Sequence, residues 1–377
     1  MKGQDRNSKM IMPNDFESSD DALRREAARI IRERQSSGLE GLVGGLQVVI
    51  INTEPDLQKA VVDDLLRYSG LEFHGAYQDE HYRTCVLKVP ALPKFRSADF
   101  LVRSRQTGKN PFLDINDAPK SRHLPNTRLE TFVFEVKDLK EYVSIQKMNG
   151  TKFITNDILN FDNYDFIQTV PSHFTGNSLG FIQWTSEPGK YASLLDETIQ
   201  WPPKKPPYPH LKNIKWLDHA ATRVKAQHRD AAILEFMSLT NYSFDFAIYV
   251  SSLNSITSVA RLSSSDFAMV FTSGISPDLN DGAFGPTEKF IRNYGSRVHH
   301  IAFQTEQIEE TYQALQNDGM KFLIELVGSP EEGLKQTFTE PSENTLLVTE
   351  YIHRYGDFQG FFTRSNVTLL TASTDRQ

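Results

Sequence analysis

Residues 298–323 read VHHIAFQTEQIEETYQALQNDGMKFL, and this stretch decides the fold. A short alternating segment predicts a β-strand, and the apolar residues after it recur at helical spacing. Gly319 then predicts a turn into a second strand. His299 and His300 stand at the start of the first strand. Because successive side chains of a strand face opposite sides of a sheet, we expect one of these histidines to face inward, where it needs partners from elsewhere in the chain.

The same pattern occurs earlier in the sequence. Residues 131–154, TFVFEVKDLKEYVSIQKMNGTKFI, align without a gap with residues 300–323, so that Thr131 falls on His300. The segment that starts at Leu46 aligns in the same way with the segment that starts at Leu217. Each half of the chain therefore contains two βαβββ modules. One module is too small to bury a face of its own sheet, so we expect the modules to combine in pairs.

Composition divides the chain into four parts. Residues 1–40 form an N-terminal extension, of which residues 1–18 are polar and predicted to be disordered. Residues 41–198 hold the first pair of modules. Residues 199–213 are predicted to be a stiff linker because five prolines fall between Trp201 and His210. Residues 214–377 hold the second pair. The predicted fold class is α+β, with four modules forming two open sheet barrels and the helices outside.

The extension also predicts a helix that begins near Asp20 and ends near Gly38. Its arginines are expected to form a solvated face, with two alternatives: a role in covering the domain, or a contact with a second subunit of a homo-oligomer. The formal charge of −7 argues against a nucleic-acid partner. Neither a signal peptide nor an apolar run of membrane-spanning length is evident. The single cysteine, Cys85, favours a reducing, cytoplasmic setting and a buried structural thiol.

Three residues of the second half are candidates for metal ligands: His219, His300 and Glu350. Two histidines and one carboxylate on one face, with other positions open, are typical of mononuclear non-haem iron sites. Glu350 is the one acid in residues 345–353, TLLVTEYIH, a mostly apolar predicted strand. The interpretation as a metal site therefore rests on three strands that would have to lie side by side.

The first half lacks these ligands. His219 and His300 fall on Val48 and Thr131, and spacing places the counterpart of Glu350 at about Gln183. The scaffold thus does not require histidine at these positions, which favours a chemical role in the second half. Taken singly, a strand histidine is more often a hydrogen-bonded core residue, and an acid near a strand end is more often solvated. Alternation alone leaves open whether His299 or His300 faces inward.

Three segments around these residues resemble the metal-ligand motifs of the 4-hydroxyphenylpyruvate dioxygenase family, in the vicinal oxygen chelate superfamily. They are LDHAAT (217–222), VHHIAF (298–303) and TEYIHRYG (349–356). The resemblance covers about residues 214–367 and extends to the first half through architecture. It implies a metal-free N-terminal domain and an Fe(II) ion bound by His219, His300 and Glu350.

Further segments extend the resemblance. LKQTFTEP (334–341) is similar to the family's LLQIFTKP, which implies Gln336 as a catalytic residue and Phe338 as an aromatic wall of the substrate pocket. Ser258 stands where the family has a pocket serine, which implies a second catalytic side chain. Without the resemblance, Phe338 would be read as core packing and Ser258 as a surface hydrogen-bonding residue.

The C-terminal part adds substrate contacts. Gly360-Phe361-Phe362 followed by Asn366 resembles the family's GFG…NF segment, which implies that Phe361 and Asn366 contact the substrate. His299 stands where the family has glutamine beside the second ligand, and we expect it to contact a different substrate. The metal ligands therefore match the family better than the substrate pocket does.

The resemblance implies an Fe(II)-dependent dioxygenase that takes dioxygen and a 2-oxo acid with an aromatic or apolar side chain. The implied reaction is oxidative decarboxylation with hydroxylation. One alternative is a ring-cleaving extradiol dioxygenase with the same ligands. Another is a non-catalytic binding protein on the same scaffold. Neither a nucleic-acid nor a membrane partner is expected.

Overall fold

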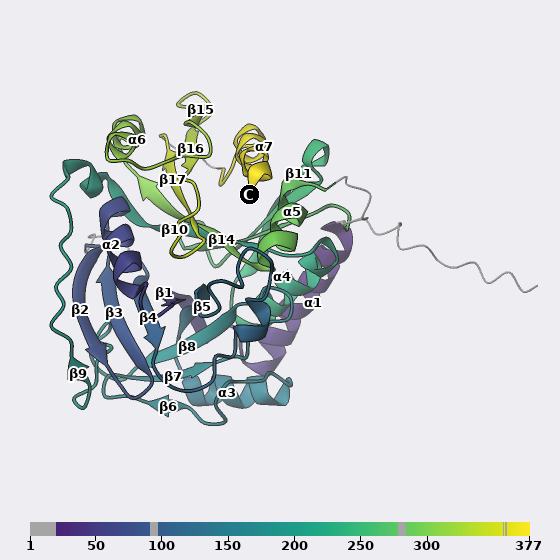
Figure 1. Ribbon diagram of the computed structural model, residues 1–377. Helices are drawn as coiled ribbons and strands as arrows, with labels where there is room; N and C mark the ends of the chain where they lie inside the picture. Colours follow the sequence, from purple (N-terminus) through teal and green to yellow (C-terminus); the bar gives the residue numbers. More distant parts are fainter. Residues whose placement is uncertain (1–19, 91–96, 278–283, 357, 359) are drawn as a thin grey trace, which may run out of the picture.

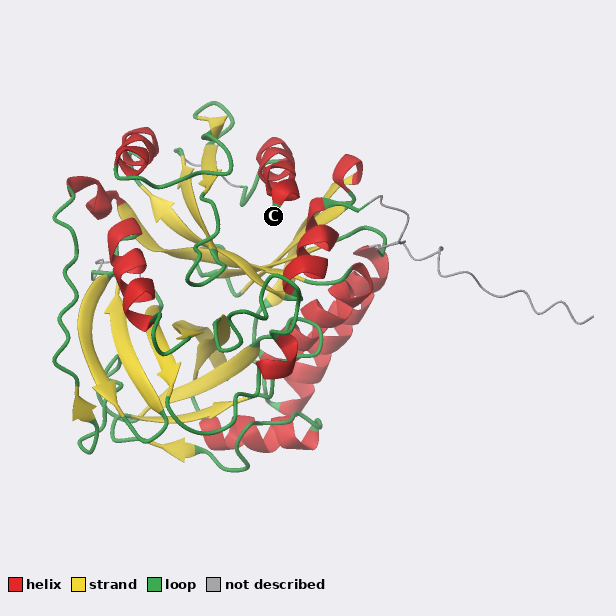
Figure 2. Ribbon diagram, viewed as in Figure 1, coloured by secondary structure: helices red, strands yellow, loops and turns green. Residues whose placement is uncertain are grey.

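The computed structural model describes residues 20–90, 97–277, 284–356, 358 and 360–377. Within these residues the strands form two mixed sheets, one from each half of the chain, with helices against their outer faces (Figures 1 and 2). The α+β class with two open sheets is therefore confirmed. The segment predicted to be disordered, residues 1–18, lies outside the described residues.

The first sheet has nine strands within the described residues, in the spatial order β6-β7-β8-β5-β1-β4-β3-β2-β9. Its central strands, β1 and β5, run antiparallel, and each has a parallel neighbour on its other side, β4 and β8. The bounds are β1 (Val43–Thr53), β2 (Glu72–Gln78), β3 (Tyr82–Lys88), β4 (Asp99–Arg105), β5 (Arg128–Val136), β6 (Leu159–Asn160), β7 (Tyr164–Gln168), β8 (Ser178–Trp184) and β9 (Glu197–Thr198).

The second sheet repeats this plan with eight described strands, in the order β11-β12-β13-β10-β14-β17-β16-β15. Here β10 and β14 form the antiparallel centre, with β13 and β17 as their parallel neighbours. The bounds are β10 (Ile214–Arg223), β11 (Ser243–Val250), β12 (Ser255–Arg261), β13 (Ala268–Ser273), β14 (Arg297–Thr305), β15 (Val327–Ser329), β16 (Leu334–Phe338) and β17 (Val348–Arg354).

The strand register confirms the alignment of the modules and corrects one position. Thr131 lies opposite Ile50 in the first sheet, and His300 lies opposite Ala221 in the second, as the ungapped alignment requires. Val133 pairs with Gly180, whereas Ala302 pairs with Glu350. The counterpart of Glu350 is therefore Gly180, and the expectation of Gln183 was wrong. The register is set by the pairing of the strands. Counting residues along the sequence misses it, because the loops of the two halves differ in length.

Four helices complete the modules and two more belong to the second half. The helices α2 and α6 bury Val61, Leu66, Ile308 and Leu315 against the outer faces of the sheets. These faces share one apolar core, in which the rings of Phe100 and Phe303 stack 6.0 Å apart. The bounds are α2 (Gln58–Tyr68), α3 (Leu139–Met148), α4 (Arg229–Leu239), α5 (Pro286–Tyr294), α6 (Ile308–Asn317) and α7 (Arg364–Ser373).

The helix predicted in the extension is α1 (Asp20–Ser37), and it packs against α4 and β11 of the second half. Its arginines do not all form a solvated face. Arg34 is buried, and its Nη1 donates hydrogen bonds to the carbonyls of Met237, Thr240 and Tyr242, at and just beyond the C-terminal end of α4. Free carbonyls at the end of a helix attract a cation, so Arg34 ties the extension to the second sheet.

The proline-rich segment lacks regular structure between β9 and the 3₁₀ turn Pro209–Asn213. The predicted boundaries at residues 41–198 and 214–377 stay a proposal. Cys85 is buried, and burial raises the pKa of its thiol to about 12, so the thiol stays protonated at neutral pH. Among the helices of the described residues, none combines the length and the apolar character needed to cross a membrane.

Candidate metal centre

Three adjacent strands bring His219, His300 and Glu350 together. His219 on β10 pairs with Ala302 on β14, which in turn pairs with Glu350 on β17. His300 lies two residues before Ala302, on the same face of the middle strand. The methyl side chain of Ala302 therefore leaves open space between the two histidines and the carboxylate. The first half has the bulkier Val133 at the position of Ala302.

The ligand atoms of this cluster converge on one point. Glu350 Oε2 lies 3.0 Å from Nε2 of His219 and 3.3 Å from Nε2 of His300. One ligand atom from each residue lies within 4.8 Å of the others. Neighbouring ligands about 2.1 Å from one metal ion lie about 3 Å apart, so the spacing fits a single ion. All three residues are buried.

The hydrogen bond that each ligand makes with its second polar atom fixes its orientation. Nδ1 of His219 donates to Asp218 Oδ1 at 2.8 Å, which leaves Nε2 facing Glu350. Gln336 Nε2 donates to Glu350 Oε1 at 2.6 Å, which leaves Oε2 for the histidines. Asn366 supports Gln336 by donating to its Oε1 at 3.0 Å. Partners of this kind set the tautomer and ring orientation of metal-binding histidines.

A chain of contacts fixes the tautomer of His300. The Oε1 atom of Gln377 accepts from Nε2 of His299 at 2.8 Å. Neutral His299 then has a lone pair on Nδ1, which accepts from Nδ1 of His300 at 2.8 Å. The Nε2 atom of His300 is left without a proton and faces Glu350. Burial, followed by neighbouring positive groups, lowers the pKa values of both rings well below the ordinary value, so both are neutral.

The electrostatics of the cluster favour a cation. Burial by itself lowers the pKa of His219, but the Glu350 charge and the Asp218 hydrogen bond outweigh it and raise this pKa to about 9. Burial would likewise raise the pKa of Asp218, but the Arg354 charge and the His219 hydrogen bond hold it below its ordinary value. The ion-free cluster therefore retains a proton on His219. A metal ion at the same place would replace that proton.

A small cavity of about 40 Å³ adjoins the cluster. Phe338 forms one wall, with its ring centroid 4.7 Å from that of His300. Val367, Leu370 and Thr371 of α7 also line it. In Figure 1, α7 lies across the open side of the second sheet, between β11 and the β15–β16 hairpin. The helix therefore closes the cavity over His300 and Glu350.

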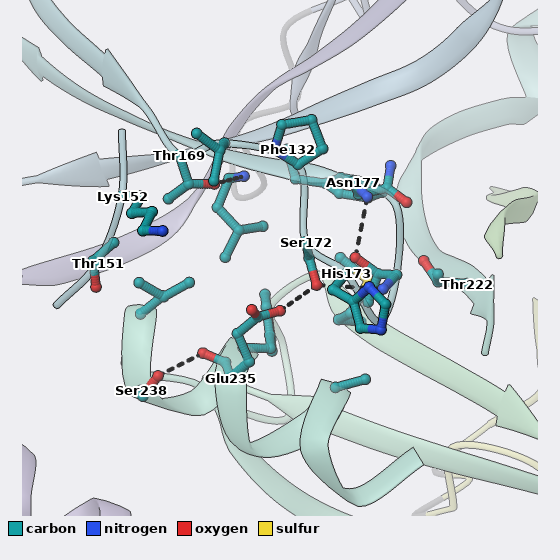
Figure 3. A pocket seen from close by; sticks show the side chains of 18 of the residues that line it. Phe132, Thr151, Lys152, Thr169, Ser172, His173, Asn177, Thr222, Glu235 and Ser238 are labelled. Carbon is teal, nitrogen blue, oxygen red and sulfur yellow. Dashed lines mark hydrogen bonds between the residues drawn. The ribbon is translucent and has the colours of Figure 1, made fainter. Parts of the chain in front are cut away.

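Larger cavities lie elsewhere in the described part of the chain, among them the following two. One, of about 350 Å³, lies between the halves of the chain, where the Ser172 hydroxyl donates to Glu235 near His173 (Figure 3). The other, of about 370 Å³, lies in the first sheet. Neither cavity is lined by His219, His300 or Glu350.

Comparison with known proteins agrees with the fold and the second half. Residues 202–348 match the model of the Glyoxalase/Bleomycin resistance protein/Dioxygenase superfamily. The match spans the proline-rich linker and most of the second half of the chain. No curated protein matches the sequence.

Two solved structures share the fold of this protein. One is a triple mutant of 4-hydroxymandelate synthase from Streptomyces coelicolor, with a TM-score of 0.63 and 14% identity, covering 88% of this chain and 98% of that one. The other is a xylose isomerase-like TIM barrel/4-hydroxyphenylpyruvate dioxygenase fusion protein, with a TM-score of 0.59 and 14% identity. It covers 94% of this chain and 58% of that one. At this identity the likeness shows the vicinal oxygen chelate fold that the sequence predicts.

One predicted site residue, Ser258, lies on the opposite side of the sheet from the cluster. Ser258 is buried on the outer face of β12, where its Oγ accepts from Nε of Arg229 in α4 at 3.0 Å. The preceding residue, Thr257, lines the cavity instead. The placement of Ser258 in the pocket was wrong because a shift of one residue along a strand exchanges its two faces.

The other predicted residues lie at or near the cluster. Gln336, Phe338 and His299 line the cavity. Asn366 does not line the cavity itself, but it hydrogen-bonds to Gln336, which does. The ring of Phe361 lies 5.5 Å from that of His219, and Arg354 lies over its face. Their roles toward a substrate stay proposals.

Sequence reasoning missed three contributors. Phe362 lines the cavity with its ring 5.1 Å from that of His219, and Arg354 pairs with Asp218 through both guanidinium ends. Asp218 itself had a signal, as an acid directly before a candidate ligand in an apolar strand. Phe362 and Arg354 had none, because only the folded chain places them there.

Proposed function

We propose that the protein is a mononuclear non-haem Fe(II) dioxygenase that acts on a 2-oxo acid with an aromatic or apolar side chain. The observation that carries the proposal is the convergence of His219, His300 and Glu350, with the near ligand atoms turned toward one another. Two imidazoles and one carboxylate suit Fe(II) and leave positions open for a substrate. The match of residues 202–348 to the model of a superfamily that includes dioxygenases supports the same reaction class.

The residues around the cluster fit a carboxylate substrate. Arg223 lies on the same face of β10 as His219 and lines the cavity. Its Nη2 donates to Thr374 at 2.7 Å, so a hydrogen bond holds the guanidinium at the cavity wall. A positive charge there would stabilise the carboxylate of a 2-oxo acid. Phe338 and Phe362 offer apolar surface for the rest of the molecule.

The chain would position the reactants and exclude water. Fe(II), when bound, would bring the 2-oxo acid and dioxygen together and supply electrons for the oxidation. His219 and His300 would each keep Nε2 unprotonated, while Gln336 would hold Glu350 in place. The cavity of about 40 Å³ is far smaller than ordinary ligand pockets, so α7 must shift to admit a substrate.

Anaerobic reconstitution with Fe(II), followed by a panel of 2-oxo acids, tests the proposal. We expect oxygen consumption with release of one CO₂ for each dioxygen consumed. Oxygen uptake with catechols and without CO₂ would instead indicate ring cleavage. A protein that retains neither Fe(II) nor Co(II) would point to a non-catalytic binding role.

A matched pair of variants links the activity to the cluster. Glu350→Ala should lose Fe(II) binding by more than about 100-fold, since removing a ligand costs more than removing its supporting partner. Glu343→Ala changes an exposed acid and should retain the metal. Full iron occupancy and turnover in Glu350→Ala would remove this residue from the ligand set.

A further inference from the structure

The concave face of the first sheet encloses a cavity of about 370 Å³ that the proposed reaction does not use. Its floor includes Val48 and Ile50 of β1 and Leu101 of β4. Pockets of about 300–1,000 Å³ are the usual size for small-molecule ligands. The cavity occupies the place in the first half that the metal cluster occupies in the second.

Strand register shows how this cavity differs from the metal centre. The row that carries His219, Ala302 and Glu350 in the second sheet carries Val48, Val133 and Gly180 in the first. The first half therefore has no metal ligands in that row, and its walls hold cations instead. Arg103 and Arg105 of β4 line the cavity, and the matching positions of β13 and the loop after it carry Thr272 and Gly274.

The two arginines are incompletely paired. Arg105 has a side chain only 7% exposed, and its Nη2 lies 3.4 Å from Glu130 Oε2. Its Nη1 is buried and has no hydrogen-bond partner. Within the described part of the chain, the guanidinium of Arg103 makes no hydrogen bond, its Nε is buried, and it lies over the ring face of Tyr82, at 5.2 Å. Buried donors without partners are rare in folded proteins and often mark a place that a ligand completes.

Within the described residues, the acids around this cavity form no ion pair with Arg103, although the charge of Glu130 acts on it. Glu130 is the nearest acid to Arg105. Asp79 accepts hydrogen bonds from the backbone of His81 and Tyr82, and Asp196 accepts from the backbone of Ser193. These acids, together with Glu80, disfavour a ligand of high negative charge. A ligand with one carboxylate would supply acceptors for both the guanidinium of Arg103 and Nη1 of Arg105, which lack hydrogen-bond partners.

The walls and the mouth of the cavity are apolar and aromatic. At the mouth, Ile154, Leu159 and Phe161 are 43%, 40% and 37% exposed, respectively, which is unusual for side chains of this size. An exposed apolar rim around a concave surface marks a binding site. The aromatic residues of the wall are Tyr77, Tyr82, Tyr164, Phe166 and Tyr191.

We propose that this cavity binds a small carboxylic acid with an aromatic body. Its carboxylate would pair with Arg103 and with the free Nη1 of Arg105, while its ring would lie among the aromatic side chains of the wall. The site does not depend on the metal centre, so it would persist if the proposed reaction were wrong.

Calorimetric titration of the full-length, metal-free protein tests the site, with phenylacetate as the probe. We expect a dissociation constant below about 1 mM. Phenylacetamide, a neutral molecule of the same shape, should bind at least about tenfold more weakly, because it cannot form the charge-assisted hydrogen bonds. An equal affinity for the amide, or no binding of phenylacetate at about 10 mM, would overturn the proposal.

Variants and methyl signals place the probe within the protein. Arg103→Met should weaken phenylacetate binding at least about tenfold, whereas Arg122→Met, at an exposed position, should not. Because Arg103 makes no hydrogen bond, its variant should unfold at the same temperature as the parent or higher. The NMR signals of the Ile50 and Leu101 methyl groups should shift with phenylacetate. Shifts confined to Leu370, beside the metal centre, would assign the binding to the other cavity and reject this one.

Discussion

Asp218 and His219 are neighbours on β10, and yet their side chains meet in a 2.8 Å hydrogen bond. The register explains the contact: Leu217 pairs with Phe303 and His219 with Ala302, so Asp218 is the extra residue of a β-bulge. The first sheet has a bulge at the same place, at Gln47. The bulge is therefore a feature of both sheets, whereas the carboxylate of Asp218 occurs only in the second.

Asp218→Asn should lower metal affinity about 10- to 100-fold. The amide removes the negative charge that makes the His219 ring a stronger donor, and it leaves Arg354 without an ion pair. Competition of Co(II) with a metal indicator measures the effect. Asp21→Asn, at an exposed position of α1, is the control. Unchanged affinity in Asp218→Asn would show that the hydrogen bond does not support the ligand.

Metal binding should depend on pH through His219. Its pKa of about 9 means that a metal must displace one proton at neutral pH. Below the pKa of a histidine, the neutral fraction increases about tenfold for each unit that the pH rises. Co(II) affinity should therefore rise by about 100-fold between pH 6.5 and 8.5 and level off above pH 9. Calorimetry in buffers of different ionisation enthalpy should show about one proton released per metal ion at pH 7.5. A flat profile would exclude this proton.

His299 is predicted to act through His300. His299→Leu removes the acceptor for the Nδ1 proton of His300, which frees the ring to rotate, so metal affinity should fall about tenfold. His299→Gln retains an acceptor and should stay within about threefold of the parent. The two variants have similar volume, so equal losses in both would indicate a packing effect and reject the role of His299 in setting the tautomer.

The helix α7 is predicted to open in the folded protein. Only Asn366, Val367 and Leu370 of its ten residues are buried. Hydrogen exchange measured by mass spectrometry should therefore find its amides at least about 100-fold less protected than those of β14. A 2-oxo acid added with Co(II) should slow this exchange. Protection of α7 equal to that of the central strands would contradict the need for opening.

Arg34 should contribute to stability although it lies outside both sheets. Arg34→Ala removes hydrogen bonds to three carbonyls, the shortest at 2.7 Å, and leaves them buried. The free energy of unfolding in urea should fall by about 3 kcal/mol. Arg25→Ala changes an exposed arginine of the same helix and should cost less than about 0.5 kcal/mol. Similar values for both variants would show that α1 is not anchored through Arg34.

Local sequence by itself determined the modules. Short-range patterns predicted the strands and helices: apolar spacing, the Gly319 turn and the ungapped match of residues 131–154 to 300–323. The strands and helices of the structure follow these patterns. The same comparison marked His219 and His300 as additions to the scaffold. Glu350 could be singled out as the one acid in an apolar strand. Its counterpart in the first half, Gly180, could not be found from the sequence.

Only the tertiary structure decided which side chains meet. Period-two alternation fails at a bulge, and His299 is an extra residue between the pairs Ala221–His300 and Thr222–Val298, so both histidines line one cavity. Thr257 lines the cavity in the position predicted for Ser258, because the strand register decides which side chains face the cavity. The contacts of Arg354 and Gln377 depend on how distant segments pack, and no local pattern encodes such packing. The unpaired guanidinium of Arg103 likewise emerges only when the first sheet closes around it.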